Sequence, residues 1–238
     1  DDVVFARDND ATGKAFGLLD KIRAQPHEGL ICATTGGREL RAVRFNMPPS
    51  ITETSSSSSC GPGARARVLV VFDFDFSLVD DDSDVRVLRE LCPELLAELA
   101  AALHTAPPSW PALVDATLGD LMQRMPHLKR DDVVRTVGAI SVAPRMLDAV
   151  RMAAHDYDAS VAIVSDANSV FIESMLQHNH LSECIEEVHT NPAHWDEENP
   201  NRLRVRPYHD HETQPPHGCE LCPVNMCKGA RWLLTSGE

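Results

Sequence analysis

Short apolar runs without polar alternation indicate where the strands of this chain lie. Residues 68–72 and 160–164 are β-branched or apolar at almost every position, which is typical of strands buried on both faces of a sheet. A third strand is expected at 184–189 and a short one at 203–205. Strands buried on both faces predict a parallel sheet with helices packed against it.

Helical patterns occupy most of the remaining chain, at residues 83–103, 113–125, 131–140, 144–155, 168–178 and 226–234. Ser83 is expected to cap the first of these helices. The alternation of strands and helices predicts an α/β fold with a parallel sheet. Because more helix separates the first two strands than a crossover needs, residues 86–155 are expected to form a helical cap inserted after the first strand.

A low-complexity stretch separates the first part of the chain from the rest. A run of serines at 55–59 is followed by Gly61-Pro62-Gly63, and such a sequence cannot bury enough apolar surface to order itself. Residues 1–66, which include an amphipathic pattern at 11–25, are therefore interpreted as an extension and linker of unknown role. The remaining chain divides into a core at 67–85 and 156–238 and a helical cap at 86–155.

Charge and cysteine content narrow the class of protein. The chain has 36 acidic and 22 basic residues, a net charge of −14, and nucleic-acid binding depends largely on Lys and Arg. No apolar run approaches the ~18 residues of a membrane span, and the first residues lack the pattern of a signal peptide. The seven cysteines are odd in number and unevenly spread. A cytoplasmic location is expected, with neither nucleic acid nor membrane as partner, and the sequence indicates no oligomeric state.

Two carboxylates follow the first expected strand directly. Asp73 and Asp75 are separated by one residue at the carboxyl end of that strand, where parallel sheets bind their ligands. One carboxylate could attack an electrophile while the other donates a proton to the leaving group. Such oxygen ligands also suit Mg²⁺. The alternative is a solvated acidic turn that caps the next helix, which is the commoner meaning of an isolated Asp-x-Asp.

Two further positions suit a phosphate group. Ser165 ends the second strand just before a helix, where a hydroxyl and the first helical amides can hold a phosphate. Lys228 opens the last expected helix and could bind a phosphate while neutralising a carboxylate nucleophile. Each signal is weak alone, because a serine before a helix is usually a cap and a lysine is usually solvated.

Together, Asp73-Phe74-Asp75-Phe76-Ser77 after a strand, Ser165 after the next strand, and Lys228 downstream resemble the haloacid-dehalogenase-like phosphatase superfamily. The resemblance covers residues 68–234. It narrows to the phosphoethanolamine/phosphocholine phosphatase family and its plant-type phosphatase relatives through the segments 72–75, 80–84, 163–168, 190–192, 207–210 and 219–229. It implies a haloacid-dehalogenase-like fold and the hydrolysis of a small phosphate monoester.

The resemblance also implies a role for each motif residue. Asp73 would be the nucleophile that forms an aspartyl-phosphate, and Asp75 the general acid and base. Both would bind Mg²⁺, Asp75 through its backbone carbonyl. Ser165, Lys228 and Ser77 would hold the phosphoryl group. Phe76, between Asp75 and Ser77, is bulkier than the residue usual there, so the turn is expected to be altered.

The head group of the substrate would be held by Asp84 and Asp166, and a pair of carboxylates in a covered site prefers a cation. Phosphoethanolamine or phosphocholine would fit, with pyridoxal phosphate, thiamine phosphate and pyrophosphate as alternatives within the family. Asp81 and Asp82 are expected to form a solvated acidic face, because the resemblance singles out their neighbours instead.

A departure from the superfamily pattern follows Lys228. A Gly-Asp-Gly motif with further acids is expected there, but the sequence ends ten residues later at Glu238. A Mg²⁺ site held by Asp73 and Asp75 alone should be weak. The sequence therefore predicts little or no phosphatase activity for residues 1–238 as they stand. It leaves open a truncated enzyme or an impaired remnant that binds a small ligand or another protein.

Three cysteines crowd together just before Lys228. Cys219, Cys222 and Cys227 contain one Cys-x₂-Cys step, and with His217 they offer four possible Zn²⁺ ligands. The second Cys-x₂-Cys step that would make the signal strong is missing. The family resemblance offers another explanation, a loop that positions Lys228. Both interpretations stay open at this point.

Overall fold

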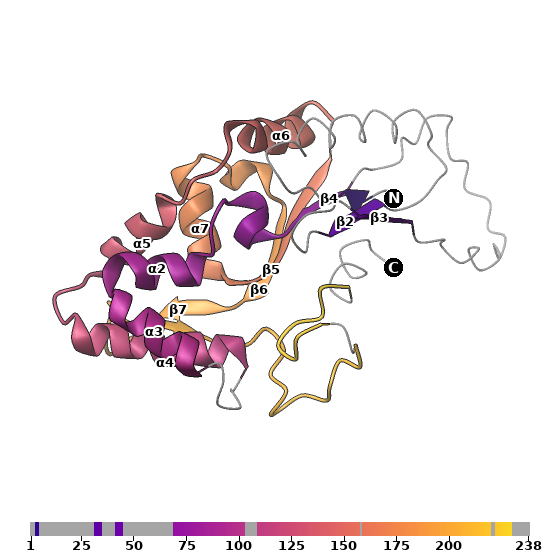
Figure 1. The fold of residues 1–238 in the computed structure, drawn as a ribbon. Coiled ribbons are helices and arrows are strands. Elements are labelled where there is room, and N and C mark those ends of the chain that lie inside the picture. Colours follow the sequence, from indigo (N-terminus) through magenta and orange to yellow (C-terminus); the bar gives the residue numbers. More distant parts are fainter. Residues whose placement is uncertain are drawn as a thin grey trace, which may run out of the picture.

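The protein has a six-stranded sheet (Figure 1) with the strand order β3-β2-β1-β4-β5-β6. A computed structural model describes residues 69–102, 109–157, 159–219 and 222–229, together with three short strands nearer the start of the chain. The strands of the sheet are β1 (Val3–Val4), β2 (Ile31–Thr34), β3 (Arg41–Arg44), β4 (Leu69–Phe72), β5 (Ser160–Asn168) and β6 (Glu187–Asn191). β4 pairs in parallel with β1 and β5, and β5 pairs in parallel with β6. β1 also pairs in parallel with β2, whereas β2 and β3 are antiparallel. The predicted α/β fold is confirmed, with a sheet that is parallel except at the β3 edge.

The sheet differs from the prediction in two places. β6 begins at Glu187, later than expected, because Ser182–Cys184 form a short 3₁₀ turn first. Three strands lie within residues 1–66, where the sequence analysis expected none, and Val3 and Val4 pair with Leu69 and Val70 of β4. The amphipathic pattern at 11–25 and the serine run lie outside the described residues.

Helices fill the segment between β4 and β5, where the sequence analysis expects a helical cap. They are α2 (Ser83–Leu91), α3 (Pro93–Ala102), α4 (Trp110–Arg124), α5 (Arg130–Gly138) and α6 (Pro144–His155), and α7 (Ser169–His178) follows β5. The prediction of one helix at 83–103 was wrong. Proline has no N–H to continue a helix but suits its first position, so the chain bends at Cys92 and α3 starts at Pro93.

Four of these helices, α2 to α5, contact one another and are called the cap below, whereas α6 packs against β5 of the sheet. Figure 1 shows α2 to α5 gathered on the side of the molecule opposite β2 and β3. α3 contacts both α2 and α4, and α5 packs against α7 of the core. A Cβ on Gly138 would lie 3.2 Å from the His178 side chain, so the glycine permits the close approach of α5 and α7. None of the helices described is both long and apolar enough to cross a membrane. Of the helix expected at 226–234, only its first residues are described.

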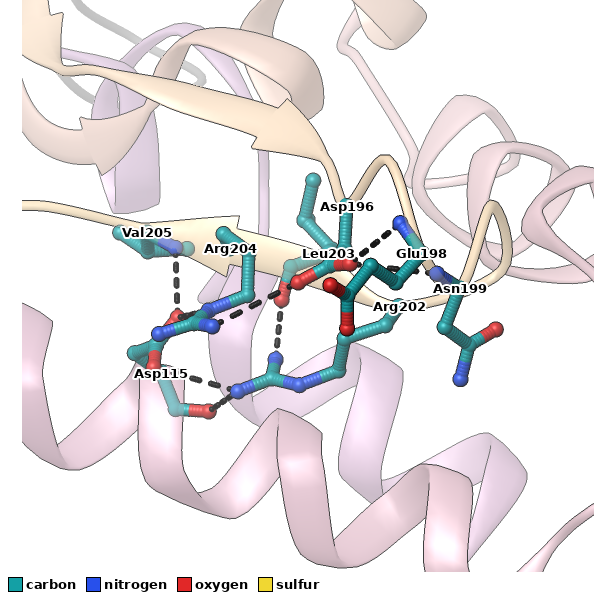
Figure 2. Close-up of polar contacts among 8 residues, drawn as sticks. All are labelled: Asp115, Asp196, Glu198, Asn199, Arg202, Leu203, Arg204 and Val205. Atoms are coloured by element: carbon teal, nitrogen blue, oxygen red, sulfur yellow. Dashed lines mark hydrogen bonds and ion pairs between the residues drawn. The ribbon is translucent and has the colours of Figure 1, made fainter.

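A polar clasp ties α4 to a separate hairpin of β7 (Ala193–Trp195) and β8 (Leu203–Val205). Figure 2 shows Asp115 of α4 facing three donors of the hairpin. Its Oδ1 accepts from the backbone amide of Val205 at 2.8 Å and from Arg204 Nε at 3.1 Å. Arg202 Nη2 donates to Asp115 Oδ2 at 3.1 Å and to its backbone oxygen at 2.6 Å. The clasp fixes the helix whose first residue, Trp110, lies over the cavity described below.

Substituting Asp115 with asparagine is expected to lower the free energy of unfolding by about 1–2 kcal/mol, because the side chain keeps an oxygen for Val205 but loses its charge. The Asp115 side chain is only 17% exposed, so solvent compensates little for the loss. Urea denaturation measures the change. Asp120→Asn, at an exposed position of the same helix, is the matched control and should change stability by less than about 0.5 kcal/mol. Equal stabilities of the two variants would rule out the clasp as a source of stability.

Candidate functional site

The turn after β4 presents the paired carboxylates. Asp73 accepts the backbone amide of Phe74 at 2.8 Å, and the chain then makes one wide turn over Phe74–Leu78. Phe74 and Leu78 are buried and anchor this turn, whereas Phe76 takes the left-handed conformation with φ 50°. This conformation is uncommon for a residue other than glycine. The ring of Phe76 is 49% exposed and faces the cavity.

A cavity of ≈ 260 Å³ lies beyond the carboxyl ends of β4 and β5. It is lined by Asp73, Asp75, Phe76, Asp82, Trp110 and Asp166. Three of the predicted site residues, Asp73, Asp75 and Asp166, therefore meet in one place although they come from two strands. The position agrees with the general rule for ligand sites of parallel sheets. Trp110, the first residue of α4, is the part of the cap that lines this cavity.

Lys228 reaches this group from the far end of the described chain. Its Nζ donates to Asp73 Oδ2 at 2.8 Å and lies 3.3 Å from Asp166 Oδ1. Burial opposes the charge of the ammonium, but the nearby carboxylates Asp73 and Asp166 raise its pKa above the ordinary value. The lysine therefore stays charged and neutralises part of the acidic cluster, as the sequence suggested.

Asp75 is the most strongly perturbed carboxyl group of the cavity. Its Oδ1 accepts the backbone amide of Ser83 at 2.9 Å. Burial, and then the charges of Asp84 and Asp82, raise the pKa of Asp75 to about 8. With no cation beside it, this carboxyl group holds a proton at neutral pH and can act as a donor.

Asp82 is a cavity residue that the sequence analysis missed. It lines the cavity instead of forming a solvated face, and burial raises its pKa. It is also the cap of α2, with Oδ1 accepting the amide of Val85 at 2.9 Å, so the expectation that Ser83 caps this helix was wrong. Both residues are good caps. The sequence signal for the correct choice was that Asp82, whose carboxylate is a charged acceptor, lies one position before Ser83.

Asp84 lies beside the cavity and not in it. The residue is 6% exposed and lines a narrow recess with Trp110 and Asp166. Its Oδ2 accepts from Trp110 Nε1 at 2.9 Å, while Oδ1 is buried with no hydrogen-bond partner among the described residues. Burial, and then Asp82 and Asp166, raise the pKa of Asp84 to about 7, with the Trp110 bond opposing the shift. Asp84 and Asp166 were predicted to hold the substrate's head group. Of the two, only Asp166 lines both the cavity and the recess.

Ser165 and Ser77, expected to hold a phosphoryl group, are not among the residues that line the cavity. Ser165 is fully buried, and its Oγ accepts the amide of Ala167 at 3.2 Å. β5 does not end at Val164 as predicted but continues to Asn168, with a register shift between these two residues. This irregularity works as a β-bulge does and turns Asp166 toward the cavity.

Asn191 at the end of β6 holds the bulge in place. Its Nδ2 donates to the backbone oxygens of Asp166 and Ala167 at 2.6 and 2.9 Å. Its Oδ1 accepts the amide of Tyr208 at 2.9 Å and Nδ2 of Asn225 at 3.2 Å. The sequence analysis noted Asn191 within the family resemblance but assigned it no role. Asn191 is 1% exposed, and because its partners are all distant in sequence, no local signal could have assigned this role.

The chemistry of the cavity fits Mg²⁺. Carboxylate oxygens are the ligands that this ion prefers, and four carboxyl groups, Asp73, Asp75, Asp82 and Asp166, face one space. Among the described residues only the ammonium of Lys228 is paired with them. A bound cation would offset the carboxylates that remain charged, and Asp73, together with the backbone oxygen of Asp75, could hold it.

Comparison with known proteins agrees with this geometry. The model of the family described as "Putative Phosphatase" matches residues 68–233. A "Thiamine phosphate phosphatase-like protein" of Arabidopsis thaliana is 35% identical over 64% of this chain and 58% of its own length. "Inorganic pyrophosphatase 1" of the same plant is 38% identical over 64% of this chain and 49% of its own.

A third relative is named for another substrate. "Pyridoxal phosphate phosphatase PHOSPHO2" of Mus musculus is 33% identical over 42% of this chain and 39% of its own length. The chain spans about half the length of the curated relatives it matches. The three relatives are named for different substrates, and all three names describe enzymes that release phosphate.

Proposed function

Because this chain belongs to the haloacid-dehalogenase-like family described as Putative Phosphatase, we propose that it hydrolyses a small phosphate monoester in the cavity below Trp110. The observation that carries the proposal is the contact of Lys228 Nζ with Asp73 Oδ2 at the cavity. A nucleophilic carboxylate beside a fixed ammonium suits an anionic electrophile, since the cation offsets the repulsion between two anions.

Two carboxyl groups share the proposed reaction, Asp73 as the nucleophile and Asp75 as the acid and base. A carboxylate oxygen of Asp73 attacks phosphorus to form an aspartyl-phosphate, and the bond from phosphorus to the ester oxygen breaks. Asp75 gives its proton to that oxygen, so the alcohol leaves neutral. A water molecule then attacks the phosphorus and gives a proton to Asp75, which releases phosphate and restores the Asp73 carboxylate. Lys228 neutralises charge on the transferring group throughout.

Asp73, and Asp75 through its backbone oxygen, would also hold Mg²⁺, which would supply positive charge for the phosphoryl oxygens. The protein's own contribution is to place the carboxylates by the wide turn after β4 and to cover them with the cap. A covered site excludes bulk water, so that only the water molecule held beside Asp75 reaches the aspartyl-phosphate.

The composition of the cavity supports a cationic head group. Phe76 and Trp110 line the same space as Asp82 and Asp166, and aromatic rings with carboxylates attract an organic cation. The unsatisfied Oδ1 of Asp84 in the adjoining recess adds a further acceptor.

Phosphoethanolamine or phosphocholine is the substrate that this set suits best. Thiamine phosphate also carries a ring cation and is the next candidate, followed by pyridoxal phosphate. Pyrophosphate carries no cationic group, and the acidic cavity disfavours it.

Phosphoryl transfer to the enzyme tests the proposal. The chain is incubated with Mg²⁺ and each ester in turn, quenched in acid, and digested, and the phosphoryl group is located by mass spectrometry. We expect it on Asp73, in a Mg²⁺-dependent manner. Because little turnover is expected of residues 1–238, the covalent adduct is the deciding readout. Absence of the adduct with every ester would refute the proposed activity.

Phosphate release from the same panel tests the head group separately. We expect phosphoethanolamine, phosphocholine and thiamine phosphate to be hydrolysed at least about tenfold faster than a neutral sugar phosphate, which corresponds to about 1.4 kcal/mol of added transition-state binding. Equal rates would be compatible with the proposed hydrolase activity. They would contradict the proposed contacts of Asp82, Asp84 and Asp166 with a cationic head group.

A further inference from the structure

Three thiols converge on the loop that precedes Lys228. The sulfur atoms of Cys219, Cys222 and Cys227 all lie within 4.8 Å of one another, and none of them is in a disulfide. All three residues are partly buried. Among the described residues this is the one group of metal-binding side chains found with such close ligand atoms.

The loop holds the thiols in place without any help from a ligand. Hydrogen bonds connect the Cys222 thiol to Cys219 and Cys227, and the backbone amide of Lys228 donates to the Cys222 sulfur. Met226, between these cysteines, is fully buried and packs under the sheet with Leu69, Val71, Ala162 and Val164. The loop is therefore anchored to the core.

His217 is not part of this group. Its Nδ1 accepts the backbone amide of Cys219 at 3.1 Å, and its Nε2 lies 3.1 Å from the backbone oxygen of Pro223. Both ring nitrogens are thus engaged in bracing the loop. Among the residues that the structure describes, the four ligands that the sequence allowed are reduced to three thiols.

We propose that Cys219, Cys222 and Cys227 bind a Zn²⁺ ion as three thiolates, with a water molecule as the fourth ligand. A tetrahedral site with Zn–S bonds of ~2.3 Å separates its sulfurs by ~3.8 Å. The observed separations therefore need to contract by no more than about 1 Å. Each thiol releases its proton as the metal binds.

This site is distinct from the carboxylates that suit Mg²⁺. Thiolates are soft ligands that select zinc, whereas carboxylates select magnesium. Cys227 directly precedes Lys228, so a metal bound to its sulfur would fix the backbone from which the lysine reaches Asp73. The zinc ion would act as a cross-link of this loop and would take no part in phosphoryl transfer.

Metal content and a cobalt spectrum test the proposal independently of any enzymatic activity. The reduced 238-residue chain is loaded with ZnCl₂, desalted, and analysed for metal by mass spectrometry. We expect one zinc per chain, and with Co²⁺ a thiolate-to-cobalt charge-transfer band in the ultraviolet. Cys222→Ser should lose the band and bind zinc at least about tenfold more weakly. Cys92→Ser, a buried cysteine in the cap, is the matched control and should retain both.

Zinc should also protect these three thiols of the unmodified chain from a thiol reagent, which keeps the test valid if Cys222→Ser fails to fold. A chain that retains no zinc would overturn the proposal. So would zinc retained equally by Cys222→Ser, or a cobalt complex without the thiolate band, since both results would place the metal on the carboxylates.

Discussion

Replacing Asp73 with asparagine is expected to abolish the phosphoryl adduct and to reduce phosphate release at least about 10⁴-fold. The amide has nearly the shape of the carboxylate but is a far weaker nucleophile, so the step that forms the aspartyl-phosphate is lost. The fold should be retained. The amide oxygen can still accept from Phe74, and Lys228 keeps its contact with Asp166 at 3.3 Å. Acid-quenched single-turnover experiments measure the adduct, and thermal unfolding checks the fold.

The matched control for this variant is Asp80→Asn. Asp80 is an exposed acid of the same turn and does not line the cavity, so its loss should leave the adduct and the rate unchanged. If Asp73→Asn still formed an adduct at the wild-type rate, another residue would be the nucleophile. If both variants lost activity equally, the effect would come from the charge of the turn and not from a specific carboxylate.

The parts of the fold that could be predicted are those with strong local patterns. β4 and the first half of β5 are apolar on both faces, and Val71 and Ile163 are indeed fully buried. β1 could not be found in this way, because two residues, Val3–Val4, are too short to show a periodicity. Its assignment to the sheet depends on pairing with β4, a contact between segments far apart in the sequence.

The candidate site divides in the same way. Asp73 and Asp75 were predicted because they follow a buried strand directly. Which of the following acids would face the cavity could not be predicted, since Asp80, Asp81 and Asp82 have the same local character. The wide turn over Phe74–Leu78 determines which acid faces the cavity. Asp82 lines the cavity, while Asp81 pairs with Arg86 and Arg89 of α2.

Ser165 shows the limit of a strand-end rule. Its position before a helix suggested a phosphate contact, but the strand continues through an irregularity and buries the hydroxyl. Nothing local to residues 160–168 reports this, because the irregularity is held by Asn191, which lies more than twenty residues further along the chain. The side chain that organises the site is thus one whose partners are all distant in sequence.

For this reason we expect a large effect from Asn191→Ala, a loss of about 3–4 kcal/mol in the free energy of unfolding. The substitution removes both donors to the backbone oxygens of Asp166 and Ala167 and the acceptor for Tyr208 and Asn225. Buried polar groups left without partners cost more than the bonds themselves are worth. Urea denaturation measures the loss, and the phosphoryl adduct should form more slowly because Asp166 is no longer held.

Two further variants separate positioning from general destabilisation. Asn199→Ala removes an exposed asparagine of the neighbouring hairpin and should change stability by less than about 0.5 kcal/mol. Asn191→Asp keeps the acceptor for Tyr208 and Asn225 but cannot donate to the bulge, so it should impair adduct formation as Asn191→Ala does. If Asn191→Asp formed the adduct at the wild-type rate, the two donated hydrogen bonds would not be what positions Asp166, and the bulge would have to be held by the strand pairing alone.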